Sequence, residues 1–170
     1  MTKTALVTGA SSGIGRGIAI KFGQEGWEIT LVARRKENLD VVAKEVEEAG
    51  GKAHIFATDL TKEGNPESAI EFGIEKMGQI GTLVNNAGMG RFEMVPDIKD
   101  ESFQEQFQLN VWACMATVRS VVPHFKKNGG GQIINIGSIV GYLGISKGSI
   151  YSSTKWALRG LNESWREELY

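Results

Sequence analysis

The chain has 170 residues, of which 41% are hydrophobic and 23% charged, and its formal net charge is -1 at pH 7. We expect one globular domain over residues 1–170, and the near-zero charge gives no electrostatic case for binding nucleic acid or an anionic membrane. No apolar run is long enough to cross a membrane, no signal peptide is visible, and cysteine and histidine lack metal-ligand spacing. The lone Cys114 excludes an internal disulfide and fits a reducing compartment, so we expect a cytoplasmic protein without a metal site.

Short apolar runs alternate along the chain with segments whose apolar residues recur at helical spacing. The apolar runs predict five strands, at about residues 4–7, 28–33, 53–57, 83–86 and 132–136. The periodic segments predict helices at about residues 14–25, 36–49, 66–77, 100–127 and 149–170. Short apolar strands separated by helices indicate an α/β protein of three layers, with a Rossmann-type doubly wound parallel sheet between two layers of helices.

A glycine-rich turn, residues 8–15 with the sequence TGASSGIG, joins the first strand to the first helix. Such a turn binds phosphate, because backbone N–H groups and the helix dipole both favour an anion there. Glycines allow the tight turn and the close approach of the backbone to a pyrophosphate. The G-x-x-x-G-x-G spacing differs from the common dinucleotide fingerprint, and glycines also serve plain turns. In this strand-turn-helix context it predicts nucleotide binding by Gly9, Ser11, Ser12, Gly13, Ile14 and Gly15.

The residues after the second strand bear on cofactor choice. In dinucleotide-binding folds an acidic residue about 20 positions past the glycine turn holds the adenosine ribose 2′-hydroxyl. Here Arg34 and Arg35 follow the strand, with no acid at its end. Their guanidinium groups could pair with a 2′-phosphate through charge-assisted bonds. A solvated arginine pair ahead of a helix is the alternative, but the switch of charge favours NADP(H) over NAD(H).

Two further strand ends carry candidate cofactor-binding residues. Asp59 and Leu60 follow the third strand, where the carboxylate could accept a hydrogen bond from the adenine amine, although a turn or helix-capping Asp fits equally well. The small residues of Asn86-Ala87-Gly88 follow the fourth strand and would let the backbone approach a ribose or adenine. A tight strand-to-loop turn is the alternative for this second segment.

Tyr151 and Lys155 are four residues apart and therefore share one face of the last predicted helix. A phenol is normally too weak an acid for proton transfer at neutral pH, and a neighbouring ammonium favours its ionised form. Taken alone, this spacing is common on surface helices. Ser138 ends the fifth strand, at the edge where open α/β sheets bind ligands, so its hydroxyl could hold a carbonyl oxygen or simply belong to a turn.

Together and in this order, the motifs resemble those of the classical short-chain dehydrogenase/reductase family. The matching residues are Thr8-Gly-x-x-x-Gly-x-Gly15, Asp59, Asn85-Asn-Ala-Gly88, Asn110, Ser138 and Tyr151-x-x-x-Lys155. The resemblance implies hydride transfer between a nicotinamide and a carbonyl or alcohol. It assigns Tyr151 as general acid and Lys155 as the residue that activates it and binds the nicotinamide ribose. It further implies that Ser138 polarises the carbonyl and that Asn110 holds a water linking Lys155 to solvent.

The nearest resemblance is to 3-oxoacyl-carrier-protein reductases and general carbonyl reductases. We therefore expect an NADP(H)-dependent reductase acting on a small carbonyl or acyl substrate. The apolar segment 139–145 favours an apolar carbonyl compound, unless it packs against its own domain. Family members pair the helices near 100–127 and 149–170 with a second subunit, which implies a homodimer or homotetramer. Apolar residues on these helices include Val111, Trp112, Met115, Val118, Val122, Trp156, Leu158 and Leu161.

The resemblance ends inside the last helix. Family members continue into a sixth strand, a Pro-Gly loop over the nicotinamide, a mobile substrate-binding segment and usually a seventh strand, whereas this sequence stops at Tyr170. A short natural product and a portion of a longer chain are both open. The adenine half of the site is expected to be complete and the nicotinamide half to lack its cover. An inactive nucleotide-binding or interaction module is therefore the alternative function.

Overall fold

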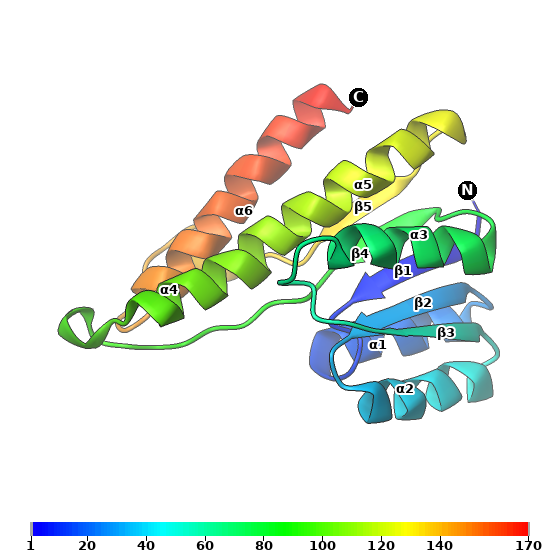
Figure 1. Ribbon diagram of the computed structural model, residues 1–170, viewed down its shortest axis with the longest axis horizontal. Coiled ribbons are helices and arrows are strands. Elements are labelled where there is room, and N and C mark those ends of the chain that lie inside the picture. Colours follow the sequence, from blue (N-terminus) through cyan, green and yellow to red (C-terminus); the bar gives the residue numbers. More distant parts are fainter. Residues whose placement is uncertain (1, 170) are drawn as a thin grey trace.

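Five parallel strands form the sheet of the computed structural model, which describes residues 2–169 (Figure 1). The strands are β1 (Thr4–Thr8), β2 (Glu28–Ala33), β3 (Lys52–Ala57), β4 (Thr82–Asn85) and β5 (Gln132–Asn135). Their order in space is β3-β2-β1-β4-β5, so the direction of winding reverses at β1. All five predicted strands are confirmed to within one residue at each end, and with them the Rossmann-type doubly wound fold.

Helices cover both faces of this sheet (Figure 1). The helices are α1 (Gly13–Gln24), α2 (Lys36–Glu48), α3 (Asn65–Met77), α4 (Asp100–Phe107), α5 (Ala113–Lys127) and α6 (Ser149–Glu168). The core under α1 and α2 contains Ile29, Leu31, Leu39, Val42 and Val46. The core under α3 and α5 contains Leu6, Leu83, Ile70, Val121 and Phe125. Because both faces of the central strands are covered, β1 and β4 are buried along their whole length, which explains why the residues at their centres are all apolar.

The helix predicted over residues 100–127 contains an irregularity that periodicity did not reveal. It is one long rod in Figure 1, but five residues between α4 and α5, η2 (Gln108–Trp112), form a π-helical turn. A π-turn widens the helix locally and is frequent at functional sites. Asn110 lies within it. Two short 3-10 turns, η1 (Val95–Asp97) and η3 (Ile139–Gly141), lie in the loops after β4 and β5.

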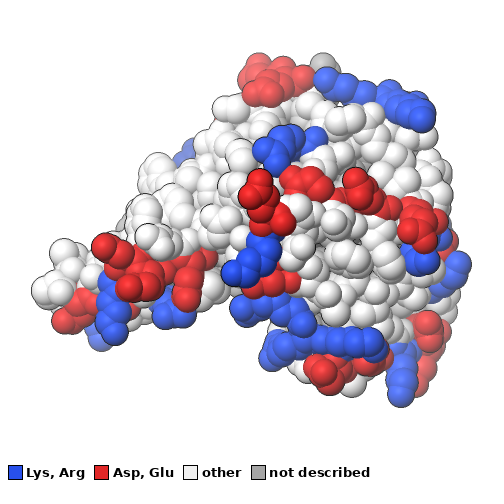
Figure 2. All heavy atoms as spheres, in the orientation of Figure 1, with Lys and Arg blue, Asp and Glu red and all other residues white. Residues whose placement is uncertain are grey.

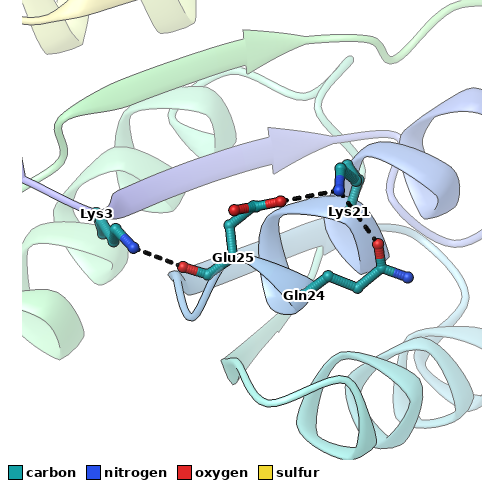
Figure 3. Close-up of polar contacts among 4 residues, drawn as sticks. All are labelled: Lys3, Lys21, Gln24 and Glu25. Atoms are coloured by element: carbon teal, nitrogen blue, oxygen red, sulfur yellow. Dashed lines mark hydrogen bonds and ion pairs between the residues drawn. The ribbon is translucent and has the colours of Figure 1, made fainter.

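A small polar network fastens the end of α1 to the start of β1 (Figure 3). The ammonium of Lys21 donates to the carboxylate of Glu25 at 2.8 Å and to the amide oxygen of Gln24 at 3.4 Å. Lys3 donates to the backbone carbonyl of Glu25 at 2.8 Å. These bonds fix the connection between α1 and β2. It lies at the amino ends of the strands, whereas the glycine turn lies at their carboxyl ends.

Charges of both signs are interspersed over the face seen in Figure 2. The narrow end of this view has uncharged atoms at its tip, where Figure 1 places the loop between β4 and α4. Within residues 2–169, no helix combines the length and apolar character needed to cross a membrane.

Candidate functional site

Two glycines of the turn, Gly9 and Gly15, leave no space for a side chain. Gly9 has φ +65°, and a Cβ there would lie 2.8 Å from the Cα of Ala87. A Cβ on Gly15 would collide with the carbonyl of Gly9 and the side-chain amide of Asn86. That same amide donates to the carbonyls of Thr8 and Gly9, each at 3.1 Å. The turn after β1 is thereby packed directly against the end of β4.

Thr8 also links the end of β1 to the end of β4. It belongs to the glycine motif, but the sequence predicted no separate role for it. Its hydroxyl accepts hydrogen bonds from the backbone N–H groups of Asn86 and Ala87, both at 3.0 Å, and donates to the carbonyl of Val84 at 3.3 Å. Thr8 is 2% exposed. Its position immediately before Gly9 is the only signal in the sequence that could have indicated this role.

A cavity of about 300 Å³ opens at the carboxyl ends of the strands. The predicted cofactor-binding residues that line it are Gly9, Ser11, Ser12, Ile14, Arg34, Arg35, Asp59, Leu60, Asn86, Ala87 and Gly88. Gly13 and Gly15 shape the turn behind it, and Gly13 has φ +57°. The wall also includes Ala33, Thr58 and Leu109, which were not predicted. A cavity that joins a glycine turn, two arginines and small strand-end residues fits the adenosine and phosphate groups of a dinucleotide.

The two arginines take different directions. Arg35 points its guanidinium at the glycine turn, with Nη2 3.4 Å from the hydroxyl oxygens of both Ser11 and Ser12. Arg34 also lines an adjoining hollow of about 670 Å³ that contains Lys62 and Arg91. A phosphate beside the glycine turn would therefore meet Arg35 and two hydroxyl groups together.

Asp59 is held by its own turn. Its Oδ1 accepts from the backbone N–H of Thr61 at 3.0 Å and from the Thr61 hydroxyl at 2.8 Å. Partial burial would raise the pKa of Asp59, but these hydrogen bonds and the positive charges of Arg34 and Lys62 outweigh it, so its pKa is lowered. Asp59 is thus an ionised turn residue that also lines the cavity, and its hydrogen bond to the adenine amine stays a prediction.

Lys155 is the buried cation of the site. Only 8% exposed, it donates from Nζ to the carbonyl of Ile136 at 2.8 Å, just past the end of β5. Within residues 2–169 no carboxylate forms an ion pair with it. Burial lowers the pKa of Lys155, with a small opposing effect from Cys114. A desolvated ammonium without an anionic partner is a mark of a functional site.

Tyr151 lies beside Lys155 as the four-residue spacing predicts, with Nζ 5.9 Å from the ring centroid. The other side of the ring meets Phe92 in an edge-on contact with centroids 5.8 Å apart. Ser138 and Lys155 line a common hollow of about 170 Å³, which Tyr151 does not line. The Ser138 hydroxyl accepts a long hydrogen bond, 3.4 Å, from the N–H of Val140. Lys155 therefore lies beside the Tyr151 ring and shares a hollow with Ser138.

Asn110 is fully bonded within the chain. Its amide nitrogen donates to the carbonyl of Met89 at 2.7 Å and to the hydroxyl of Thr154 at 3.0 Å, and its oxygen accepts from the N–H of Met89 at 2.8 Å. Asn110 is 2% exposed. It clamps the loop after β4 to α6, next to Lys155. Its predicted contact with a water is not tested by these bonds.

The order of the strands and the glycine turn at the switch point define a dinucleotide-binding α/β protein. A family model for short chain dehydrogenases matches residues 3–170. The chain belongs to the short-chain dehydrogenase family, a family of oxidoreductases.

Two curated relatives illustrate the range of activities in this family. The chain is 33% identical over 167 residues to a 3-oxoacyl-[acyl-carrier-protein] reductase of Thermotoga maritima, covering 98% of this chain and 68% of the relative. It is 34% identical over 172 residues to an L-2,3-butanediol dehydrogenase of Corynebacterium glutamicum, covering 99% of this chain and 67% of the relative. The chain spans about two thirds of the length of both.

Two solved structures resemble the fold closely and differ in cofactor. A metagenomic short-chain oxidoreductase in complex with NADP has a TM-score of 0.94 and 35% identity, covering 99% of this chain and 77% of that one. An NAD+-bound xylitol dehydrogenase has a TM-score of 0.94 and 28% identity, covering 99% of this chain and 65% of that one. The same fold therefore binds NADP in one of these two proteins and NAD+ in the other. Within residues 2–169 no group of three or more metal-ligating side chains is found.

Proposed function

We propose that the protein is an NADP(H)-dependent reductase of apolar carbonyl compounds, either a 3-oxoacyl-carrier-protein reductase or a general carbonyl reductase. The observation that carries this proposal is the buried, unpaired ammonium of Lys155 next to the ring of Tyr151. Burying a cation without an anionic partner is costly, so a purely structural role is a poor explanation for it.

The residues of the chain divide the chemistry between them. When bound, the cofactor supplies the hydride that reduces the carbonyl carbon. The phenol of Tyr151 donates the proton that the carbonyl oxygen takes up, which turns the carbonyl into an alcohol. The ammonium of Lys155 stabilises the phenolate that remains, through their close approach in a poorly solvated place. The Ser138 hydroxyl donates a hydrogen bond to the carbonyl oxygen and so polarises the carbonyl.

The preference for NADP(H) rests on Arg35. Its guanidinium lies 3.4 Å from each of two serine hydroxyls of the glycine turn, Ser11 and Ser12, so a 2′-phosphate there receives one charge-assisted and two neutral hydrogen bonds. An acidic residue that would hold a free ribose 2′-hydroxyl is missing at the end of β2.

The apolar character of the substrate is suggested by the loop after β5. Ile139, Tyr142, Leu143 and Ile145 are all more than 40% exposed, so this segment does not pack fully against its own domain. Exposed apolar side chains in the segment that leads from Ser138 to Tyr151 favour an alkyl or aryl carbonyl compound over a sugar or a charged acid.

The test is NADPH oxidation with a panel of ketones, diketones and 3-oxoacyl thioesters, with NADPH binding measured on the same preparation. Turnover that disappears in Tyr151→Phe while NADPH binding persists is the expected result. Binding without turnover of any carbonyl would refute the reductase and support an inactive nucleotide-binding module. Absence of NADPH binding would refute both.

We further propose assembly into a homodimer or homotetramer through the rod of α4 and α5 and through α6. Trp156 and Phe103 are each 49% exposed on these helices. Val118 and Leu158, which the sequence suggested for the same contact, are instead buried within the chain and cannot contribute. Sedimentation at micromolar concentration should give a dimer or larger species, and a monomer would contradict the assembly.

A cytoplasmic location belongs to the same proposal, supported by the single, buried Cys114.

A further inference from the structure

An exposed aromatic ring lies directly against Tyr151. Phe92 is 55% exposed, and its ring meets that of Tyr151 with centroids 5.8 Å apart and planes inclined by 64°. Gly90 leaves room for this contact, because a Cβ there would be 3.2 Å from the Tyr151 ring and 3.4 Å from the Phe92 ring. The surface next to the phenol is therefore an open aromatic face.

The loop that carries Phe92 is held at several points. The buried Oε1 of Gln106 accepts a hydrogen bond from the N–H of Arg91 at 3.1 Å. The N–H of Glu93 donates to the carbonyl of Lys147 at 2.8 Å. Both neighbours of Phe92 thus have fixed backbones, and Asn110 fixes Met89 just before them. An exposed ring on a fixed backbone is preorganised for a ligand.

The contact with Lys147 joins this loop to the segment that leads into α6. Lys147 has φ +62°, the only non-glycine residue among those described with a positive φ. Such a conformation costs free energy and persists where the surrounding structure imposes it, commonly near functional sites. Since α6 begins two residues later, the junction sets the distance between Phe92 and Tyr151.

Charged side chains close to Phe92 already have partners within the chain. Arg91 forms an ion pair with Glu105. The carboxylate of Glu93 accepts from the Ser102 hydroxyl at 2.9 Å, and its second oxygen is buried without a partner in the described chain. That oxygen would repel an anion. The next two side chains, Met94 and Val95, are also apolar and exposed.

We propose that Phe92 is the specificity-determining residue of the proposed reductase, and that its ring receives a flat, uncharged aryl substituent of the carbonyl substrate. This inference rests on the proposed function. With the carbonyl oxygen at the phenol of Tyr151, the substituent on that side of the carbonyl carbon extends over the Phe92 ring. Aromatic pairs gain energy beyond the area they bury, so an aryl ketone is favoured over a small diketone that cannot reach the ring.

The experiment compares acetophenone with diacetyl as substrates for the wild type, Phe92→Ala, Phe92→Tyr and the control Val95→Ala. Val95 belongs to the same loop and is 73% exposed, so its truncation removes apolar surface without touching Tyr151. We expect Phe92→Ala to lower kcat/KM for acetophenone about tenfold, with less than a threefold change for diacetyl. Phe92→Tyr and Val95→Ala should keep the wild-type ratio of the two substrates.

Binding of acetanilide, an aryl amide that hydride transfer does not reduce, is measured by saturation-transfer NMR as a readout independent of turnover. Acetanilide binding that is lost in Phe92→Ala and kept in Val95→Ala supports the aryl-binding role of Phe92. If this pattern is found but no carbonyl is turned over, only the proposed reductase function fails. An equal loss for both ketones, an equal effect of Val95→Ala, or acetanilide binding that does not depend on Phe92 would overturn the proposal. Because Phe92 is largely exposed, its truncation should leave the fold intact, and Phe92→Leu provides a second variant.

Discussion

Reversing the charge of Arg35 should separate NADPH from NADH. In Arg35→Asp a carboxylate replaces the guanidinium that faces Ser11 and Ser12 at 3.4 Å. Two unit charges about 4 Å apart interact by about 4 kcal/mol at an effective dielectric constant of about 20. Arg35 is exposed, so solvent and salt screen much of this, and a hydrogen bond to a charged group contributes about 1.5–3 kcal/mol.

We therefore expect Arg35→Asp to weaken NADPH binding by about 2–3 kcal/mol, or about 30- to 150-fold in Kd. NADH lacks the 2′-phosphate, so its Kd should change less than about threefold. The matched control is Arg34→Asp, which makes the same change of charge one residue away, where the side chain also faces the adjoining hollow. It should cost NADPH binding clearly less.

The assay is a fluorescence titration of each variant with both reduced cofactors at two salt concentrations. The preference of the wild type for NADPH should decrease as salt rises, because the interaction is electrostatic. Equal losses for NADPH and NADH in Arg35→Asp would refute the phosphate site at Arg35. A larger effect at Arg34 would move the site to that residue.

Three further predictions follow from the geometry of the site and the sheet. Tyr151→Phe should reduce carbonyl turnover to a few per cent or less while NADPH binding stays normal, whereas Lys155→Ala should impair both turnover and binding. Turnover near the wild-type rate in Tyr151→Phe would mean that another residue is the general acid. Gly9→Ala should destabilise the chain by about 1–3 kcal/mol in urea denaturation, because Gly9 has a positive φ and there is no space for a Cβ. The control Gly17→Ala lies at an open helical position and should be neutral or slightly stabilising. Hydrogen bonds with a histidine and then with a lysine lower the pKa of Glu28, so its stabilisation is present above the unfolded pKa and is lost as pH falls through the folded pKa. Glu28→Gln should therefore reduce the unfolding free energy by up to about 1 kcal/mol at pH 7, and this difference should shrink as pH falls through the folded pKa of Glu28. A pH-independent difference would count against the ion pair.

The sheet could be predicted because its chemistry is local to each strand. Strands buried on both faces have uninterrupted apolar sequences, and the turns between them carry glycine or proline. The roles of Gly9 and Gly15 could also be predicted. A glycine-rich turn between a strand and a helix indicates positions where lack of space or a positive φ excludes other residues. Eleven of the predicted cofactor-binding residues line one cavity for the same reason: parallel strands bring their carboxyl ends to one edge.

The features that escaped prediction depend on tertiary contacts. The π-turn around Asn110 could not be predicted from the apolar spacing. It inserts one extra residue, and this shift is smaller than the normal variation of apolar spacing along a long amphipathic helix. Arg34 and Arg35 are neighbours with the same side chain, so only their directions distinguish them. Phe92 lies in a loop without periodicity, and its contact with Tyr151 joins residues far apart in sequence.

The strand order also sets the sequence in which the protein can be assembled during synthesis. β1 pairs on one side with β2, through Thr4 and Glu28, and on the other with β4, through Ala5 and Thr82. The first pairing closes a short loop, and the second must wait for a much longer segment to leave the ribosome. A nascent chain that has completed β1, β2 and β3 already contains the glycine turn and both arginines, whereas Tyr151 and Lys155 join last. A partly synthesised chain is therefore expected to contain the residues proposed to bind the nucleotide phosphate before it contains Tyr151 and Lys155.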